Sequence, residues 1–126
     1  MMNKELGLVG IGGFIGASAR HLVSSNISKP YGTLVVNSIG SLLIGVLFGI
    51  VAISNIISKE LMLLLGVGIL GAFTTKSAVS SDLVGLFNDK RYLKLGSYFF
   101  ANSIGGPILA FIGWTSAQKY LNKEDK

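Results

Sequence analysis

The sequence predicts an all-α integral membrane protein in which four transmembrane helices form a single domain, residues 1–126. Half of the 126 residues are hydrophobic and only 13% are charged, whereas soluble domains carry about 25% charged residues. Four apolar stretches are each long enough to cross a hydrocarbon core of about 30 Å, which takes about 20 helical residues. These stretches are Leu6–Val23, Gly32–Ile57, Leu61–Phe87 and Leu95–Ala117.

The first stretch has one rival interpretation, a cleaved secretory signal. Lys4 fits the charged start of such a signal, but no small-x-small cleavage site is followed by soluble sequence. We therefore expect this stretch to stay in the membrane. The chain contains no cysteine, which excludes disulfides and thiolate metal sites.

The basic residues are divided between the two sides of the membrane. The formal net charge of +5 is compatible with nucleic-acid binding, but these residues lie mainly in connectors and tails, so membrane topology explains them better and we expect no nucleic-acid partner. Four crossings place Lys4, Lys59, Lys119, Lys123 and Lys126 on one side and Lys29, Lys90, Arg91 and Lys94 on the other. So small a bias barely selects an orientation. Insertion both ways would permit an antiparallel dimer, and a partner could equally set the orientation.

The first span carries small residues and ends near an arginine. Gly10, Gly12 and Gly16 approximate a dinucleotide-binding fingerprint, but that fingerprint needs a preceding strand and an acid about 20 positions later, and neither is present. Gly12 and Gly16 instead indicate close helix packing through a small-xxx-small face. Arg20 is either an interfacial residue that reaches lipid head groups or a cation that guards an anion vestibule.

The second span begins with polar residues and continues with apolar ones. Asn37 lies about one turn inside and Ser41 follows four residues later, so both share a helix face. Asn37 either joins helices through hydrogen bonds or offers its amide donors to an anion. Gly45 and Gly49 form a second small-residue packing pair.

The third span turns from apolar to polar along Gly68–Asp82, at a depth where the bilayer holds no water. An unsatisfied backbone group costs several kcal/mol there. We expect the helix to break near mid-membrane, at Gly71–Thr75, where freed carbonyls and the hydroxyls of Thr74 and Thr75 would suit a hard cation such as Na⁺. The alternative is a mild kink stabilised by Thr and Ser side chains.

The fourth span has one polar and small stripe on an otherwise apolar helix. Tyr98, Asn102 and Gly106 are spaced four residues apart, and Ser103 lies beside them. This stripe is either a packing seam or a hydrated track.

No catalytic constellation is present in the sequence, so we do not expect an enzyme. There is one histidine, and the acidic residues lie mainly at ends and connectors. Asp82 is nearer the membrane but has no second carboxylate beside it. Serine-based hydrolysis would need a base within reach, and no residue can be proposed for that role.

Three motifs together resemble the Fluc (CrcB-type) family of small fluoride channels. They read Gly-Gly-x-x-Gly-Ala-x-x-Arg at Gly12–Arg20, Gly-Thr-Leu-x-x-Asn-x-x-Gly at Gly32–Gly40 and Gly-x-x-Gly-x-x-Thr-Thr at Gly68–Thr75. Each motif alone would be weak, but their order within four spans of this length is specific. The resemblance covers most of the chain.

This resemblance implies a multi-pass protein of the bacterial inner membrane that forms an antiparallel dimer with two pores and conducts fluoride passively. It implies a central Na⁺ held by the backbone carbonyls of Gly71 and Thr74, and a vestibule arginine at Arg20. Amide and hydroxyl donors in a low-dielectric slot could replace the water that fluoride holds strongly. The residues that would line the anion path are Asn37, Thr75, Ser77, Tyr98, Asn102 and Ser103.

The chain departs from the family where the family reads Thr-Thr-Phe-Ser-Thr-Phe, with two phenylalanines whose ring edges line the fluoride path. Lys76 and Val79 occupy these two positions, and neither can supply the positive edge of an aromatic ring. A lysine at this depth also costs about 2.5–3.5 kcal/mol on insertion scales unless it faces water or a partner. The departure implies a degenerate subunit that keeps the Na⁺ site and pairs with a homologous subunit bearing both phenylalanines. Alternatively, Lys76 itself assists an anion.

Two other functions are compatible with four short helices. A proton-coupled multidrug transporter needs a membrane-embedded carboxylate in its first helix, but Leu6–Val23 contains no acid and Glu5 lies at its extreme end. A non-conducting assembly subunit would use its glycines for packing only and would show no dependence on ions.

Overall fold

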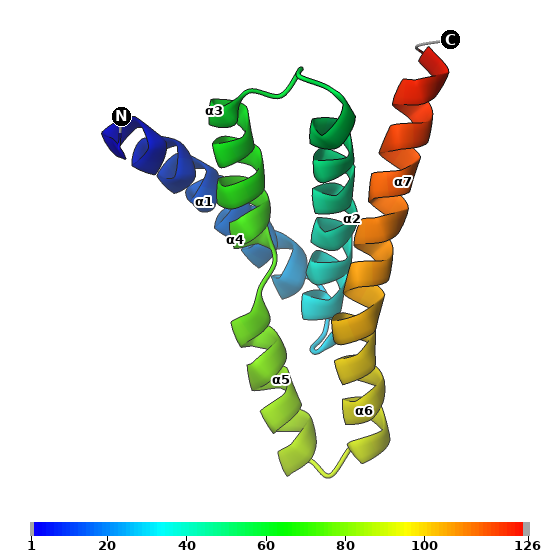
Figure 1. The fold of residues 1–126 in the computed structure, drawn as a ribbon. Helices are drawn as coiled ribbons and strands as arrows, with labels where there is room; N and C mark the ends of the chain where they lie inside the picture. Colours follow the sequence, from blue (N-terminus) through cyan, green and yellow to red (C-terminus); the bar gives the residue numbers. More distant parts are fainter. Residues whose placement is uncertain (1, 125–126) are drawn as a thin grey trace.

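The computed structural model describes residues 2–124, and throughout that range the chain forms helices joined by short connectors (Figure 1). The elements in chain order are α1 (Met2–Ser25), α2 (Tyr31–Ile53), α3 (Lys59–Met62), η1 (Leu63–Leu70), α4 (Gly71–Phe73), α5 (Lys76–Asn88), α6 (Tyr92–Phe100), η2 (Ala101–Gly105) and α7 (Gly106–Glu124). The segments η1 and η2 are π-helical. No strand occurs among the described residues.

These elements combine into four helices of membrane-spanning length and apolarity, as predicted. They are Asn3–Ser25, Tyr31–Ile53, Lys59–Asn88 and Tyr92–Lys123. The chain is therefore a multi-pass membrane protein. The second helix ends at Ile53, four residues before the predicted Ile57, because Ser54 adopts an extended backbone. The fourth helix is longer than predicted and continues beyond Ala117 to Glu124.

The third helix is broken, which confirms the prediction. α4 ends at Phe73, and Thr74 and Thr75 both adopt extended backbones with ψ angles of 154° and 118° before α5 begins at Lys76. Figure 1 shows this as a short extended segment between α4 and α5. The break lies near the middle of Lys59–Asn88, so it falls at mid-membrane depth when this helix spans the bilayer.

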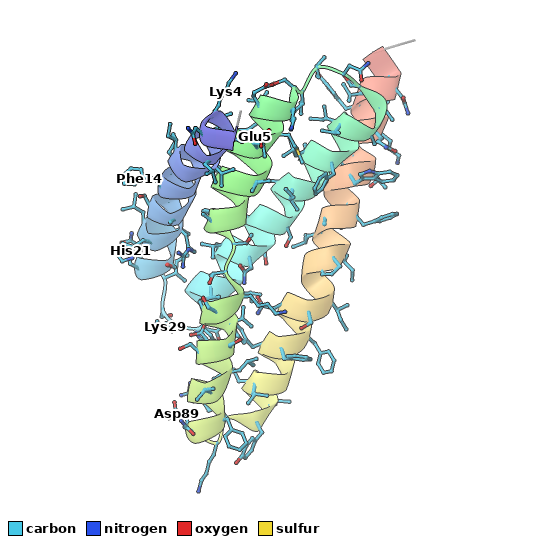
Figure 2. All side chains as sticks on the ribbon, turned by 60° about the vertical axis from the view of Figure 1, so that its left-hand side comes forward. Lys4, Glu5, Phe14, His21, Lys29 and Asp89 are labelled. Atoms are coloured by element: carbon cyan, nitrogen blue, oxygen red, sulfur yellow. The ribbon has the colours of Figure 1, made fainter. Side chains whose placement is uncertain are left out.

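The four helices form two closely packed pairs above the break. α1 crosses η1 and α4, and α2 lies alongside α7. Below the break, α5 packs against α6. Figure 2 shows Lys4 and Glu5 at one end of the bundle and Lys29 and Asp89 toward the other, as the predicted division of charge requires. Lys126, which was assigned to the first side, lies outside the described residues.

The predicted small-residue contact of the first helix is present. A Cβ atom added at Gly12 would lie 2.9 Å from the Cα of Gly68, and one added at Gly16 would overlap the carbonyl of Ile69. The backbones of α1 and the third span therefore touch. Such close approach is the usual way in which membrane helices gain packing energy, since lipid tails are as apolar as leucine.

The glycine pair of the second helix serves the same purpose against the fourth. A Cβ at Gly45 would overlap the backbone of Ala110, and one at Gly49 would lie 2.7 Å from the carbonyl oxygen of Trp114. α2 and α7 consequently form the most extensive helix pair in the structure.

Most large apolar side chains face outward from this single chain. Phe14 is 76% exposed and Phe111 is 64% exposed, and the side chain of Phe14 points away from the bundle in Figure 2. Within residues 3–123 the buried hydrophobic side chains number only six: Val36, Leu47, Phe73, Leu86, Tyr98 and Ala117. An apolar exterior around a small core is what a lipid-embedded chain requires.

The α1 contact predicts different outcomes for two neighbouring glycines. Gly16→Ala would force a methyl group against the Ile69 backbone and should destabilise the fold by about 1–3 kcal/mol. Gly13→Ala has no atom within 4 Å of its new Cβ and should be neutral or slightly stabilising because alanine favours helix. Thermal unfolding of both variants in detergent micelles tests this. Equal losses of Tm in Gly16→Ala and Gly13→Ala would contradict the close contact between α1 and the Ile69 backbone.

Candidate functional site

The break in the third span is held by the side chain of Asn37 from α2. The Thr75 N–H donates to Asn37 Oδ1 at 2.8 Å, and Asn37 Nδ2 donates to the Thr75 carbonyl oxygen at 3.1 Å. The side-chain amide thus pairs with both backbone groups of one residue, as a neighbouring peptide would. Asn37 Nδ2 also donates to Asn102 Oδ1 at 3.1 Å, which ties η2 to the same point.

The two helix ends beside the break carry their own caps. The Leu70 carbonyl accepts from both the backbone N–H and the hydroxyl of Thr74, each at 3.1 Å. Thr75 is the N-cap of α5, because its hydroxyl accepts from the Ala78 N–H at 3.2 Å. The two hydroxyl bonds are side-chain contacts of the kind that stabilises a helix terminus in lipid.

The carbonyl oxygens of Gly71 and Thr74 are among those beside the break that receive no donor from the described residues. In an unbroken helix the Gly71 carbonyl would accept from the Thr75 N–H, which is directed to Asn37 instead. The Thr74 carbonyl would accept from the Ala78 N–H, which is directed to the Thr75 hydroxyl. No hydrogen bond reaches either oxygen from the described residues. The same part of the chain contains no cluster of three or more His, Cys, Asp or Glu, so these backbone oxygens are the oxygen donors that would suit a hard cation.

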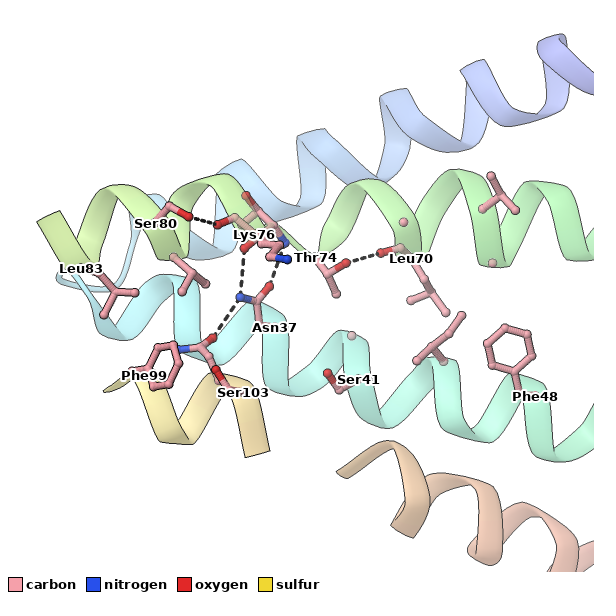
Figure 3. A pocket seen from close by; sticks show the side chains of 18 of the residues that line it. Asn37, Ser41, Phe48, Leu70, Thr74, Lys76, Ser80, Leu83, Phe99 and Ser103 are labelled. Atoms are coloured by element: carbon pink, nitrogen blue, oxygen red, sulfur yellow. Dashed lines mark hydrogen bonds between the residues drawn. The ribbon is translucent and has the colours of Figure 1, made fainter. Parts of the chain in front are cut away.

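A cleft of about 710 Å³ passes along the break between α2, the third span and the fourth span (Figure 3). Eight of the sequence-predicted site residues line it: Asn37, Gly71, Thr74, Thr75, Lys76, Val79, Asn102 and Ser103. Its other polar lining residues are Ser41, which shares a face with Asn37 as predicted, and Ser80, which was not among the predicted site residues.

Three predicted site residues lie outside this cleft. Arg20 is half-buried, and its Nε donates to the Ala72 carbonyl oxygen at 3.1 Å, so its guanidinium caps the end of α4. The Ser77 hydroxyl lies 3.2 Å from that of Thr75, outside the lining. Tyr98 is 4% exposed and donates from its hydroxyl to Asp82 Oδ2 at 2.8 Å.

The Asp82–Tyr98 pair joins α5 to α6 and was missed from the sequence. Asn102 extends it, since Asn102 Nδ2 donates to the Tyr98 carbonyl oxygen at 2.9 Å. The feature of the sequence that could have revealed this pair is the carboxylate of Asp82, which lies within the third span. An acid within a span needs a buried donor, and Tyr98 is a hydroxyl-bearing residue of the adjacent span.

A single ion pair occurs in the described part of the chain, and it lies at the membrane edge. Lys59 Nζ lies 2.8 Å from Glu5 Oε1 and so joins the start of α3 to the start of α1. Both side chains are substantially exposed, so the contact contributes little to stability.

Comparisons with known proteins give one consistent result. Residues 7–114 match the family model described as "CrcB-like protein, Camphor Resistance (CrcB)". A relative from Oceanobacillus iheyensis is 38% identical over 122 residues, covering 94% of each chain, and one from Nautilia profundicola is 40% identical over 90% of this chain and 93% of its own. A relative from Pyrococcus furiosus is 37% identical over 92% of this chain and 98% of its own. All three are named "Fluoride-specific ion channel FluC".

The Asn37 bonds predict a specific local change. Asn37→Leu removes the partner of both Thr75 backbone groups and should cost about 1–3 kcal/mol for each buried group left unpaired. Amide hydrogen exchange across residues 71–78 should accelerate, and Ser38→Ala, one position along α2, should leave it unchanged. If exchange at the break is the same in both variants, Asn37 does not hold it.

Proposed function

The chain belongs to the CrcB-like protein family, and on this basis we propose that it is a subunit of a fluoride-selective channel that passes cytoplasmic fluoride out through the bacterial inner membrane without energy input. The names of its relatives, at 37–40% identity over nearly the whole chain, support this proposal. The cleft beside the helix break is the observation on which the proposal rests in this molecule.

The lining of the cleft has the chemistry that fluoride selection needs. Its donors that make no bond to another described residue are the hydroxyls of Ser41 and Ser103, whereas the Asn37 amide donates to Thr75 and Asn102. None of its lining residues is acidic. Fluoride holds its water strongly, so a pore must offer dense donors in its place. Donors act more strongly in the low dielectric of a membrane-spanning domain.

A structural Na⁺ at the helix break is a second part of the proposal. The Gly71 and Thr74 carbonyl oxygens have no donor from the described residues, and oxygen ligands suit a hard cation. They also lie near the C-terminal end of the half-helix formed by residues 59–73, where the helix dipole is negative. The ion would neutralise these oxygens at a depth where water cannot.

Pairing with a homologous subunit in antiparallel orientation is the third part. Basic residues occur at both ends of the bundle in nearly equal number, which leaves the orientation undetermined by the chain itself. Lys76 and Val79 stand where the family has its two pore phenylalanines, so the partner would supply intact rings. The large apolar residues that face outward leave ample surface for both lipid and such a partner.

The multidrug-transporter alternative receives no support from the structure. Glu5, the one acid of α1, lies at the start of that helix and pairs with Lys59 at 2.8 Å. It is therefore placed at the membrane edge, away from the position that proton exchange with a drug would need.

Fluoride efflux from liposomes tests the channel and its partner requirement together. We expect little flux from the chain reconstituted alone, and rapid flux that excludes chloride when a homologous subunit with both phenylalanines is present. Rapid fluoride current from the single chain would contradict the partner requirement. Absence of fluoride flux in every pairing with intact homologues would contradict the channel.

The Na⁺ proposal predicts stabilisation by this ion alone. At 100 times its dissociation constant, a ligand of the folded state adds about 2.7 kcal/mol. The Tm of the detergent-solubilised protein should therefore rise as NaCl replaces choline chloride at constant ionic strength. A Tm that does not vary with Na⁺ would reject the site.

A further inference from the structure

One charged side chain lines the cleft, and no counter-ion for it occurs among the described residues. Lys76 is the only ionisable residue among the nineteen that line the cleft. The single ion pair of the described residues joins Lys59 and Glu5 at the membrane edge, so no carboxylate lies within 4 Å of the Lys76 ammonium. Asp82, the nearest acid along the chain, accepts its hydrogen bond from Tyr98.

The position of Lys76 makes this charge costly without a partner. It is the first residue of α5, directly after the break near the middle of the third span. Charged groups at this depth are paired or face a hydrated cavity. Figure 3 shows the Lys76 side chain beside Asn37 and Thr74 within the cleft. The positive end of the α5 dipole adds to the same field.

The same cleft also contains neutral hydrogen-bond donors. The hydroxyls of Ser41 and Ser103 line it and make no hydrogen bond to any described residue. The Asn37 amide, in contrast, is engaged with Thr75 and Asn102. An anion entering the cleft would therefore meet one ammonium and free hydroxyls, and no carboxylate.

We propose that Lys76 is the fixed cation of a binding site for a small monovalent anion within this chain's own cleft, and that the serine hydroxyls complete the site. The identification of this anion as fluoride rests on the proposed function. Hydrogen bonds to an ionised donor are about twice as strong as neutral ones, and conduction requires that an ion leave as readily as it enters. The site holds its anion longer than a pore lined by neutral groups would.

Fluoride binding to the purified chain tests this site without any flux measurement. Equilibrium dialysis with radioactive fluoride, in zwitterionic detergent, should show binding that weakens about tenfold or more in Lys76→Met, which keeps the length of the side chain but removes its charge. Lys76→Arg should retain affinity to within about threefold, which separates charge from fold. Lys119→Met, which removes an exposed lysine of α7, should not change binding.

The alternative occupants give different results. If phosphatidylglycerol added to the micelles displaces fluoride from the parent chain, the ammonium binds a lipid phosphate and the proposal fails. Fluoride binding equal in Lys76→Met and the parent chain also overturns it. Lys76-dependent fluoride binding combined with no flux in any subunit pairing would support the site while rejecting the channel. Flux that depends on the partner but not on Lys76, together with equal fluoride binding in Lys76→Met and the parent chain, would support the channel while rejecting the anion site.

Discussion

The Thr75 backbone lies inside a membrane span and has lost its helical partners, and the hydrogen bonds it forms with Asn37 are the interaction on which the site depends. A broken helix in lipid is tolerated only where its polar groups find substitutes. One side-chain amide provides both bonds at 2.8 and 3.1 Å. Thr74, Thr75 and Arg20 add bonds to the Leu70 carbonyl, the Ala78 N–H and the Ala72 carbonyl on either side.

Because Asn37 pairs with the Thr75 backbone, the two sides of the break differ chemically. Toward α4 it leaves the Gly71 and Thr74 carbonyl oxygens without donors, at the negative end of a half-helix, which suits a cation. Toward α5 it places Lys76 at the positive end of the second half-helix and in a cleft without carboxylates. The proposed Na⁺ site and the proposed anion site therefore follow from the same interruption of the chain. Each would reduce the electrostatic cost of holding the other in a low dielectric.

Much of this arrangement could be predicted from the sequence because its causes are local. Apolar length gave the spans, glycine spacing gave the contacts of Gly16 and Gly45, and the block of Thr and Ser residues gave the break. The family resemblance gathered eight residues that the structure places along one cleft. The end of the second helix was misplaced because Ile56 and Ile57 are as apolar as the helix that they follow.

The remaining features depend on which side chains meet across helices, which spacing along one helix does not reveal. The sequence offered lipid head groups or a vestibule as the surroundings of Arg20 and did not reveal its bond to the Ala72 carbonyl oxygen. The stripe that contains Tyr98 was predicted as either a packing seam or a hydrated track, and the spacing did not reveal the buried bond of Tyr98 with Asp82. The π-helical turns of η1 and η2, which are frequent at functional sites, have no distinct sequence signal.

The conformation of Thr74 and Thr75 in a lipid bilayer tests the central claim most directly. Solid-state NMR of the chain uniformly labelled with ¹³C and ¹⁵N, reconstituted in lipid, reports the backbone conformation of each residue through its Cα and Cβ chemical shifts. We expect extended-type shifts for Thr74 and Thr75, between helical shifts at Phe73 and Ser77. Helical shifts through all of residues 71–77 would show an unbroken span and contradict the account.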